Sequence, residues 1–321
     1  MMERRQIADT ELQVSPVALG CWPLSGMTSP GVTEADSRAT IAAALDLGIN
    51  FFDTAFAYGA AGESERYIAE VLAAHRDEYV VATKAGLHWE NGTQHRDARP
   101  ATIRREVAES LRRLNTDRVD VLYLHAPDRN TPITETAAAF RRLQQEGAAI
   151  AIGVSNLTLS ETLEFHQVCP IQIIQPPYNM LFRGAEMDLV PWCREQNIAV
   201  ACYWPLMKGL LAGKMSLDQK FEPRDSRPKY PCFRGEEYAK NLELVEKLRA
   251  MAERMGCTVS QLVIRWTIDQ PGVTAALCGA KRVDQLTDNA GALGWELTLG
   301  EQAEIALLLR DRGVPYVVAT P

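Results

Sequence analysis

The sequence lacks the features that define several classes of protein. Its longest uncharged stretch, residues 165–182, contains a histidine, three glutamines and three prolines, so no segment is expected to span a membrane. The first residues carry charges where a signal peptide requires an apolar core, which predicts a cytoplasmic protein. The net charge of −7 argues against a nucleic-acid partner bound through a general basic surface.

The sequence also lacks the spacings of disulfide and metal frameworks. The seven cysteines are odd in number and none are spaced as CxxC, which favours buried free thiols in a reducing compartment. We expect no metal site, because no metal-like spacing relates His75, His88, His95 and His166. No low-complexity segment or linker divides the chain, so we predict one domain over residues 1–321.

Six short apolar runs are each followed by a polar residue, and this placement is the most informative feature of the chain. The runs are rich in β-branched residues and alternate with helical stretches, as buried parallel strands do; they span residues 49–52, 79–83, 119–124, 149–154, 171–174 and 198–202. The polar residues that follow them are Asp53, Lys84, His125, Ser155, Asn156, Gln175 and Tyr203. A closed barrel of parallel strands gathers their C-terminal ends on one face, so these residues are expected to share a pocket.

The alternation of strand and helix patterns predicts an α/β protein with a (β/α)₈ barrel. Strands at 17–20 and 274–279 bring the count to eight, and a hairpin over 4–7 and 11–14 precedes them. Helices are predicted over 33–48, 64–74, 100–114, 134–146, 159–167, 185–196, 237–255 and 260–270. Residues 208–236 are expected to form a long loop on the C-terminal face. A doubly wound sheet is the alternative on pattern alone, but no GxGxxG motif follows the first strand.

One set of polar residues is suited to carbonyl chemistry: Asp53, Tyr58, Lys84 and His125. A tyrosine phenol has an unperturbed pKa near ~10, and a lysine ammonium within hydrogen-bonding reach lowers that pKa. A buried lysine needs a counter-charge, which Asp53 can supply, while the histidine can donate a hydrogen bond to a carbonyl oxygen. Taken singly, Asp53, Lys84 or His125 is better explained as a polar residue at a strand end whose hydrogen bonds are made within the protein. Three ionisable residues at the same end of three consecutive strands favour a general-acid site.

Three motifs resemble those of the aldo-keto reductase family. They are residues 50–59 (NFFDTAFAYG) with 62–65 (GESE), residues 153–156 (GVSN) and residues 203–214 (YWPLMKGLLAGK). The resemblance covers residues 17–293 in the family's motif order and is closer to the bacterial and potassium-channel β-subunit branches than to mammalian aldose reductase. It implies a (β/α)₈ fold and NADPH-dependent reduction of aldehydes or ketones. It also implies a catalytic set with Tyr58 as the acid, comprising Asp53, Tyr58, Lys84 and His125.

The resemblance also implies a site for the nicotinamide ring of NADPH. Ser155, Asn156 and Gln175 match residues that bind the carboxamide group, and Tyr203 matches the aromatic residue that stacks on the ring. Polar side chains and a flat face would hold the ring with one side toward the substrate. From the residues alone, Asn156 or Thr158 could instead cap the next helix, and Gln175 could belong to a buried turn before two prolines.

The segment after the last predicted strand resembles the family's adenosine-phosphate site. A helix that begins near Arg282 would offer free backbone N–H groups to an anion, and Lys281 and Arg282 would add positive charge for a 2′-phosphate. A solvated helix start is the alternative from the residues alone. The resemblance thus favours NADPH over NADH. The other cofactor residues that it implies are Gly20, Cys21, Trp22, Asp53, Pro205, Leu206, Lys208, Gly209, Lys214, Gly279, Gln285, Asp288 and Asn289.

The substrate is expected to be a small-molecule carbonyl compound, bound in a pocket that includes Trp22, Tyr58, Trp89 and His125. Specificity is expected to rest on residues 87–99, 208–236 and 312–321, because loops on a barrel face vary without disturbing the scaffold. The competing function is a regulatory subunit that senses a nicotinamide cofactor, as channel β-subunits of the family do. No long basic or apolar N-terminal extension suited to docking precedes the barrel pattern, which favours the enzyme.

Overall fold

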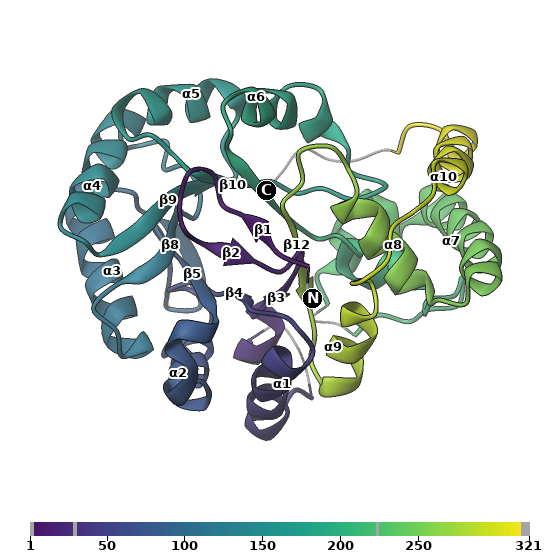
Figure 1. Ribbon diagram of the computed structural model, residues 1–321, viewed down its shortest axis with the longest axis horizontal. Coiled ribbons are helices and arrows are strands. Elements are labelled where there is room, and N and C mark those ends of the chain that lie inside the picture. Colours follow the sequence, from purple (N-terminus) through teal and green to yellow (C-terminus); the bar gives the residue numbers. More distant parts are fainter. Residues whose placement is uncertain (1–2, 28–30, 223–224, 316–321) are drawn as a thin grey trace.

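The computed structural model describes residues 3–27, 31–222 and 225–315 and contains a closed barrel of eight parallel strands (Figure 1). In order around the barrel they are β3 Val17–Gly20, β4 Phe51–Asp53, β5 Val80–Ala85, β8 Val119–Leu124, β9 Ala149–Ser155, β10 Ile173–Gln175, β11 Ala199–Tyr203 and β12 Ala275–Gly279. The predicted (β/α)₈ barrel is confirmed, and the doubly wound sheet is excluded. That residues 1–321 form one domain stays a prediction.

Helices surround the barrel, and several of them begin where a side chain caps the backbone (Figure 1). Their bounds are α1 Glu34–Asp46, α2 Glu63–Val71, α3 Pro100–Leu114, α4 Ile133–Gln145, α5 Leu159–Val168, α6 Leu189–Glu195, α7 Gly235–Met255, α8 Val259–Ile268, α9 Val283–Ala290 and α10 Leu299–Arg312. In a capping box, a threonine and the residue three positions on satisfy each other's backbone N–H groups. Such boxes begin α1, α5, α8 and α10, with the caps Thr33, Thr158, Thr258 and Thr298.

The predicted N-terminal hairpin is confirmed, with strands β1 Arg5–Gln6 and β2 Gln13–Val14, and it closes the N-terminal end of the barrel. Ile7, Leu12 and Val14 from this segment are buried in one cluster with the inward-facing residues of the barrel strands. The hairpin lies across the barrel opening in Figure 1. Apolar contacts therefore seal one end of the barrel, and the C-terminal ends of the strands are left to form a site.

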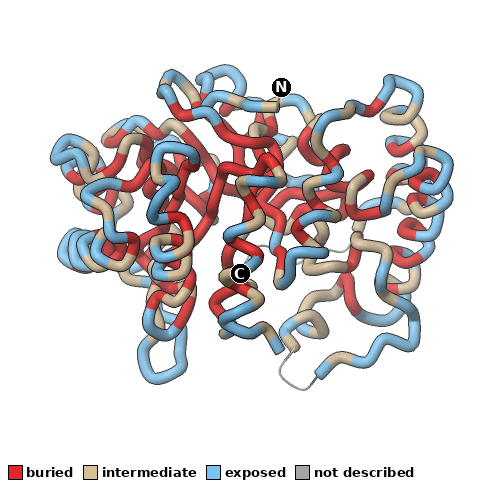
Figure 2. Tube along the Cα trace, turned by 60° about the horizontal axis from the view of Figure 1, so that its bottom comes forward, coloured by how far each residue is buried: buried red, intermediate tan, exposed pale blue. Residues whose placement is uncertain are grey.

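Alternate strand residues divide the core into a barrel interior and a layer beneath the helices. Figure 2 shows buried backbone running through the centre of the molecule and exposed backbone around it. Tyr123 fills part of the interior, and its ring centroid lies 5.9 Å from the Lys84 Nζ. Gly153 is required opposite this ring, because a Cβ atom there would lie 2.5 Å from it. The barrel interior beneath Lys84 is therefore filled by packed side chains.

A hairpin and a helix have no counterpart in the sequence-based prediction. β6 Leu87–Glu90 and β7 Thr93–Arg96 form a hairpin within a segment that we expected to be a loop. Its turn residues, Asn91 and Gly92, have φ values of 50° and 76°, as two-residue hairpin turns require. The second element is α10, whose capping box of Thr298 and Glu301 was a local signal for its start.

Several 3-10 helices interrupt the connections. They are η1 Trp22–Ser25, η2 Ala73–Glu78, η3 Gly184–Glu186, η4 Met207–Ala212, η5 Arg227–Lys229 and η6 Pro231–Phe233. η3 shortens the predicted helix over 185–196, because Asp188 caps α6 only after this turn. The last three lie in or beside the predicted long loop over 208–236. Of the predicted specificity segment 312–321, the part from residue 316 onward lies outside the described residues.

Two sequence-based expectations about classes of protein can be compared with this fold. All seven cysteines are free, and six of them are buried, which agrees with the expected buried thiols. Within the described part of the chain, no helix combines the length and the apolar character that a membrane crossing requires.

Candidate active site

Lys84 is the centre of a buried polar group at the C-terminal end of the barrel. It lies in β5, and only 1% of its side chain is exposed. Its Nζ donates hydrogen bonds to both carboxylate oxygens of Asp53, at 2.8 and 2.7 Å, and to the Thr54 carbonyl at 2.8 Å. It also lies 3.3 Å from the Tyr58 hydroxyl. Asp53 ends β4 and Tyr58 follows in the next loop, so neighbouring strands bring together these predicted catalytic residues.

The Lys84 ammonium group has three protons, and these face four acceptor atoms. At least one proton is therefore shared, and the contact to the Tyr58 hydroxyl is the longest of the four. Burial lowers the pKa of Lys84, while the adjacent Asp53 carboxylate acts in the opposite direction. Asp53 thus compensates the charge of Lys84, and the contact to Tyr58 is the one most easily lost.

Tyr58 keeps its proton at neutral pH, because its surroundings disfavour the phenolate. Burial raises the pKa of Tyr58 well above its usual value, and the negative charge of Asp53 raises it further. Burial therefore outweighs any lowering of this pKa by Lys84, and the expected effect of Lys84 stays a prediction. A tyrosine that is protonated at neutral pH can act as a proton donor, which is the state that a general acid requires.

His125 follows β8 and lies beside Tyr58, with the two ring centroids 5.9 Å apart. Burial lowers the pKa of His125 well below its usual value, and the charge of Lys84 lowers it further. The neutral ring keeps one N–H donor, and its buried Nδ1 atom has no hydrogen-bond partner among the described residues. Its backbone is fixed by hydrogen bonds to Ala85 and Asn156. The backbone of His125 is therefore fixed, and its imidazole has unused hydrogen-bonding capacity.

Two tryptophans lie next to the Tyr58 loop. The Trp22 ring meets the Tyr58 ring edge-on, with centroids 4.9 Å apart. Trp89, in β6, donates a hydrogen bond from its indole N–H to the Ala57 carbonyl at 3.0 Å. This bond fixes the β6–β7 hairpin to the loop that carries Tyr58. The structure thus places the four predicted pocket residues together, and their contact with substrate stays a prediction.

The four predicted nicotinamide residues form a hydrogen-bonded cluster beside the lysine group. Ser155 donates to the backbone carbonyl of Gln175 at 2.8 Å, and the Tyr203 hydroxyl donates to the Asn156 side chain at 2.7 Å. The Gln175 amide donates to Asp53 at 2.7 Å. The predicted cofactor residues and the predicted catalytic residues therefore belong to one network.

The local alternatives for two of these residues are settled by their positions. Asn156 does not cap α5, because Thr158 occupies the N-cap and completes a capping box. Asn156 instead has a φ of 61°, a conformation that asparagine tolerates better than most side chains. Gln175 is the last residue of β10 and bonds Asp53 across the barrel end, so it is more than part of a turn.

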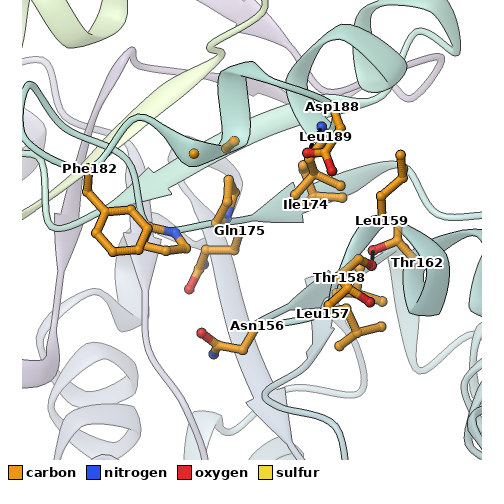
Figure 3. A pocket seen from close by; sticks show the side chains of 15 residues that line it. Asn156, Leu157, Thr158, Leu159, Thr162, Ile174, Gln175, Phe182, Asp188 and Leu189 are labelled. Carbon is orange, nitrogen blue, oxygen red and sulfur yellow. Dashed lines mark hydrogen bonds between the residues drawn. The ribbon is translucent and has the colours of Figure 1, made fainter. Parts of the chain in front are cut away.

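A cavity of about 260 Å³ opens beside this cluster, between the start of α5 and the β10–α6 connection (Figure 3). Most of its lining residues are apolar, among them Leu157, Leu159, Ile174, Phe182 and Leu189. Asn156 and Gln175 are also among the lining residues, so the cavity adjoins the predicted nicotinamide residues.

A cluster of positive charge lies at the other side of the site. Burial lowers the pKa of Lys208 and of Lys281, and nearby Arg227 lowers both further. Lys208 Nζ lies 4.5 Å from the ring centroid of Trp204, over its face, and Arg227 is held by Asp225. An anion among these cations would relieve their repulsion.

Arg227 was not among the predicted cofactor residues. The signal that could have found it is its pairing with Asp225, the acid two positions earlier.

The helix start near Arg282 is confirmed, because α9 begins at the next residue with Arg282 as its N-cap. One backbone N–H that the sequence analysis left free for an anion is not free, since Lys281 N donates to the Gln285 side chain at 2.8 Å. Arg282 pairs with Asp284 at 2.9 Å, and 56% of its side chain is exposed. A surface pair of this kind is weak, so the guanidinium can exchange its partner for another anion.

The remaining predicted cofactor residues are placed as follows. Gly20 and Gly279 are paired at the ends of β3 and β12, and Cys21 is fully buried. Asp288 accepts a hydrogen bond from Thr258 and lies 3.8 Å from Lys214, while Asn289 donates to the Gly279 carbonyl. Pro205, Leu206 and Gly209 lie in the connection that contains η4. Contact of these residues with a cofactor stays a prediction.

Comparison with known proteins places this site in a family. The chain matches the aldo/keto reductase family over residues 16–309. It is 39% identical over 313 residues to aldo-keto reductase YhdN of Bacillus subtilis (strain 168), a match that covers 97% of this chain and 94% of that protein. It is 32% identical over 315 residues to an NADH-specific methylglyoxal reductase of Escherichia coli (strain K12), covering 92% and 95%.

Solved structures agree with this assignment. The structure of a glycerol dehydrogenase from Gluconobacter oxydans matches with a TM-score of 0.91 and 36% identity, covering 99% of this chain and 98% of that one. An aldo-keto reductase from Bacillus halodurans in its holo form matches with a TM-score of 0.81 and 28% identity, covering 96% of each chain. The protein therefore belongs to the aldo/keto reductase family of oxidoreductases, as its motifs indicate.

Proposed function

We propose that this protein reduces aldehydes or ketones to alcohols and that Tyr58 is the general acid. The observation that carries the proposal is the chain of contacts from Asp53 through Lys84 to the Tyr58 hydroxyl, at 2.7 and 3.3 Å, with His125 beside it. A protonated phenol next to a neutral imidazole gives a carbonyl oxygen two donors. Family membership supports the same reaction class.

Each residue has a distinct role in this reaction. Tyr58 donates its hydroxyl proton to the carbonyl oxygen as negative charge develops there, and Lys84 stabilises the phenolate that remains. Asp53 holds Lys84 in position and keeps it charged. The His125 N–H donates a hydrogen bond to the same oxygen and fixes the substrate's orientation. General-acid assistance of this kind is worth roughly 10²–10⁴-fold in rate.

The residues present fit a nicotinamide dinucleotide. Asn156 and Gln175 can bind a carboxamide, and Tyr203 has a ring beside them that could stack on a flat heterocycle. Lys208 and Gly209 have φ values of 54° and 91°, a backbone conformation that suits the binding of anions such as a pyrophosphate. When bound, the nicotinamide ring would supply the hydride that reduces the carbonyl carbon.

Small carbonyl compounds are the substrates that we propose, because Trp22 and Trp89 restrict the space beside Tyr58. One relative is a methylglyoxal reductase and one structural neighbour is a glycerol dehydrogenase. The test is the oxidation of NADPH and of NADH, followed by absorbance, with methylglyoxal, glyceraldehyde and a bulky diaryl ketone. We expect turnover of the two small aldehydes. If neither cofactor is oxidised with any of them, the protein is better explained as a cofactor-sensing regulatory subunit.

We further propose NADPH rather than NADH as the cofactor, with Lys281 and Arg282 binding the 2′-phosphate. Each charged contact to a phosphate is worth about 1.5–3 kcal/mol, less where the side chain is as exposed as that of Arg282. The double variant Lys281→Ala/Arg282→Ala should therefore raise the Kd for NADPH by ~10²-fold, since each 1.4 kcal/mol corresponds to tenfold. The Kd for NADH should barely change. Fluorescence titration with both cofactors measures the difference.

The control for this prediction is Lys247→Ala, which removes a charge from a surface pair on α7 and should leave both Kd values unchanged. Equal losses of NADPH and NADH affinity in the double variant would show that these side chains do not read the phosphate. That outcome would fit the solvated helix start.

A further inference from the structure

The loop that carries Tyr58 packs against a buried ion pair, Arg113 with Glu65. Arg113 lies near the end of α3 and Glu65 in the first turn of α2, and their charged groups are 3.2 Å apart. The exposed fractions of the two side chains are 11% and 0%. Burying two charges costs several kcal/mol per ion before their attraction offsets it, so such a pair is weak evidence for stability. Its contacts suggest a different role.

Arg113 contacts the Tyr58 loop on both sides of the tyrosine. Its Nη1 donates a hydrogen bond to the Phe56 carbonyl at 3.1 Å, and its guanidinium lies over the Phe56 ring, 4.4 Å from the centroid. At the other end of the loop, Gly62 packs so closely on the Arg113 side chain that a Cβ atom would lie 2.5 Å from it. The guanidinium thus holds both ends of this loop, together with backbone hydrogen bonds such as that from Phe56 N to the Lys84 carbonyl.

Glu65 contacts the strand that carries Lys84. The Thr83 hydroxyl donates to the Glu65 carboxylate at 2.6 Å, and Thr83 directly precedes Lys84 in β5. The negative charge of Glu65 also acts on Lys84 in the same direction as Asp53 does. The ion pair therefore connects the tyrosine loop to the lysine strand, the two parts whose separation sets the 3.3 Å contact between Tyr58 and Lys84.

We propose that Arg113 and Glu65 are positioning residues for the proton transfer, which hold the Tyr58 hydroxyl within hydrogen-bonding reach of Lys84. The inference rests on the proposed function of Tyr58. The contact that they maintain is the longest of the four that Lys84 makes, so a small shift of the loop breaks it first. A displacement of about 1 Å from a productive geometry can cost on the order of 10²-fold in rate.

The test must separate positioning from folding. Arg113→Met alone leaves the Glu65 carboxylate buried without a counter-charge, and this variant is expected to be unstable. The double variant Arg113→Met/Glu65→Gln removes both charges and keeps an acceptor for the Thr83 hydroxyl. It should fold, with a Tm near that of the wild type, and bind NADPH with an unchanged Kd. Its kcat with methylglyoxal should nevertheless fall by at least ~10-fold.

The matched control is Arg112→Met. Arg112 is the preceding residue of the same helix, and both it and Arg113 pair with Glu109. Its side chain, however, is 73% exposed and does not contact the Tyr58 loop in the described structure. Its kcat should equal that of the wild type. A double variant with the same kcat as this control would overturn the inference.

The pH dependence of kcat distinguishes positioning from a purely structural role. If the pair only stabilised the fold, its loss would not shift the pH profile. If the Tyr58 hydroxyl moves away from Lys84 in the double variant, the ammonium no longer stabilises the phenolate. The pKa of Tyr58 should then rise, and the basic limb of the profile should shift to higher pH. A lower kcat with an unmoved basic limb would assign the pair a structural role only. If the wild type and Arg112→Met reduce no carbonyl compound, the proposed function itself fails, and the inference fails with it.

Discussion

Replacing Tyr58 by Phe is expected to lower kcat by at least ~10²-fold, because the new ring fills the same space but has no proton to donate. The change removes only the 3.3 Å contact of Lys84, whose shorter contacts to Asp53 and Thr54 remain. The fold and the affinity for NADPH should therefore be preserved. Oxidation of NADPH with methylglyoxal measures kcat, and fluorescence titration measures the Kd.

The matched control for this variant is Tyr67→Phe. Tyr67 lies on α2, its ring packs against the Arg38 guanidinium, and it makes no contact with the lysine group in the described structure. Its turnover should be that of the wild type. A Tyr58→Phe variant with nearly normal kcat would show that another group supplies the proton, and the proposed mechanism would be wrong.

Replacing Lys84 by Met is expected to affect both stability and rate. It leaves the Asp53 carboxylate, which is 3% exposed, without its counter-charge. An unpaired buried charge of this kind costs about 3–5 kcal/mol of folding free energy. The rate of carbonyl reduction should fall as well, because no ammonium remains to stabilise the Tyr58 phenolate. Urea denaturation measures the stability, and NADPH oxidation measures the rate of the folded fraction.

A second substitution separates these two effects. Asp53→Asn replaces the carboxylate by a neutral amide of the same shape, so the double variant Lys84→Met/Asp53→Asn should recover much of the lost stability without recovering kcat. Lys247→Met, on the surface of α7, controls for the loss of a lysine. If Lys84→Met is as stable as the wild type, the two groups do not form the charged buried pair that we describe.

The barrel is predictable from the sequence because its strands and helices carry local signals. Buried parallel strands are apolar runs of a few residues, and the predicted ranges 17–20 and 119–124 are those of β3 and β8. The capping residue Thr33 likewise marks the start of α1. The β6–β7 hairpin and α10 also have local signals, but both lie outside the strand–helix repeat on which the prediction was built.

The candidate site is predictable only in part. Residues at strand ends, such as Lys84 and His125, can be placed on one face once the barrel is recognised. The partners of their side chains cannot, because pairs such as Arg113 and Glu65 are 48 residues apart and leave no periodic trace in the sequence. For the same reason, the sequence suggested that Lys84 controls the pKa of Tyr58, whereas burial is the larger cause. Burial is a property of packing, which residue spacing alone does not describe.

The claim that this protein reduces a carbonyl group is tested most directly by following the hydrogen that leaves C-4 of the nicotinamide ring. NADPH with both C-4 hydrogens of the nicotinamide ring replaced by deuterium would be incubated with the wild-type protein and methylglyoxal, and the product analysed by mass spectrometry. Carbonyl reduction predicts an alcohol that carries deuterium on the former carbonyl carbon, formed in step with cofactor oxidation and nearly absent with Tyr58→Phe. Oxidation of the cofactor without a deuterated alcohol would contradict the proposed reaction.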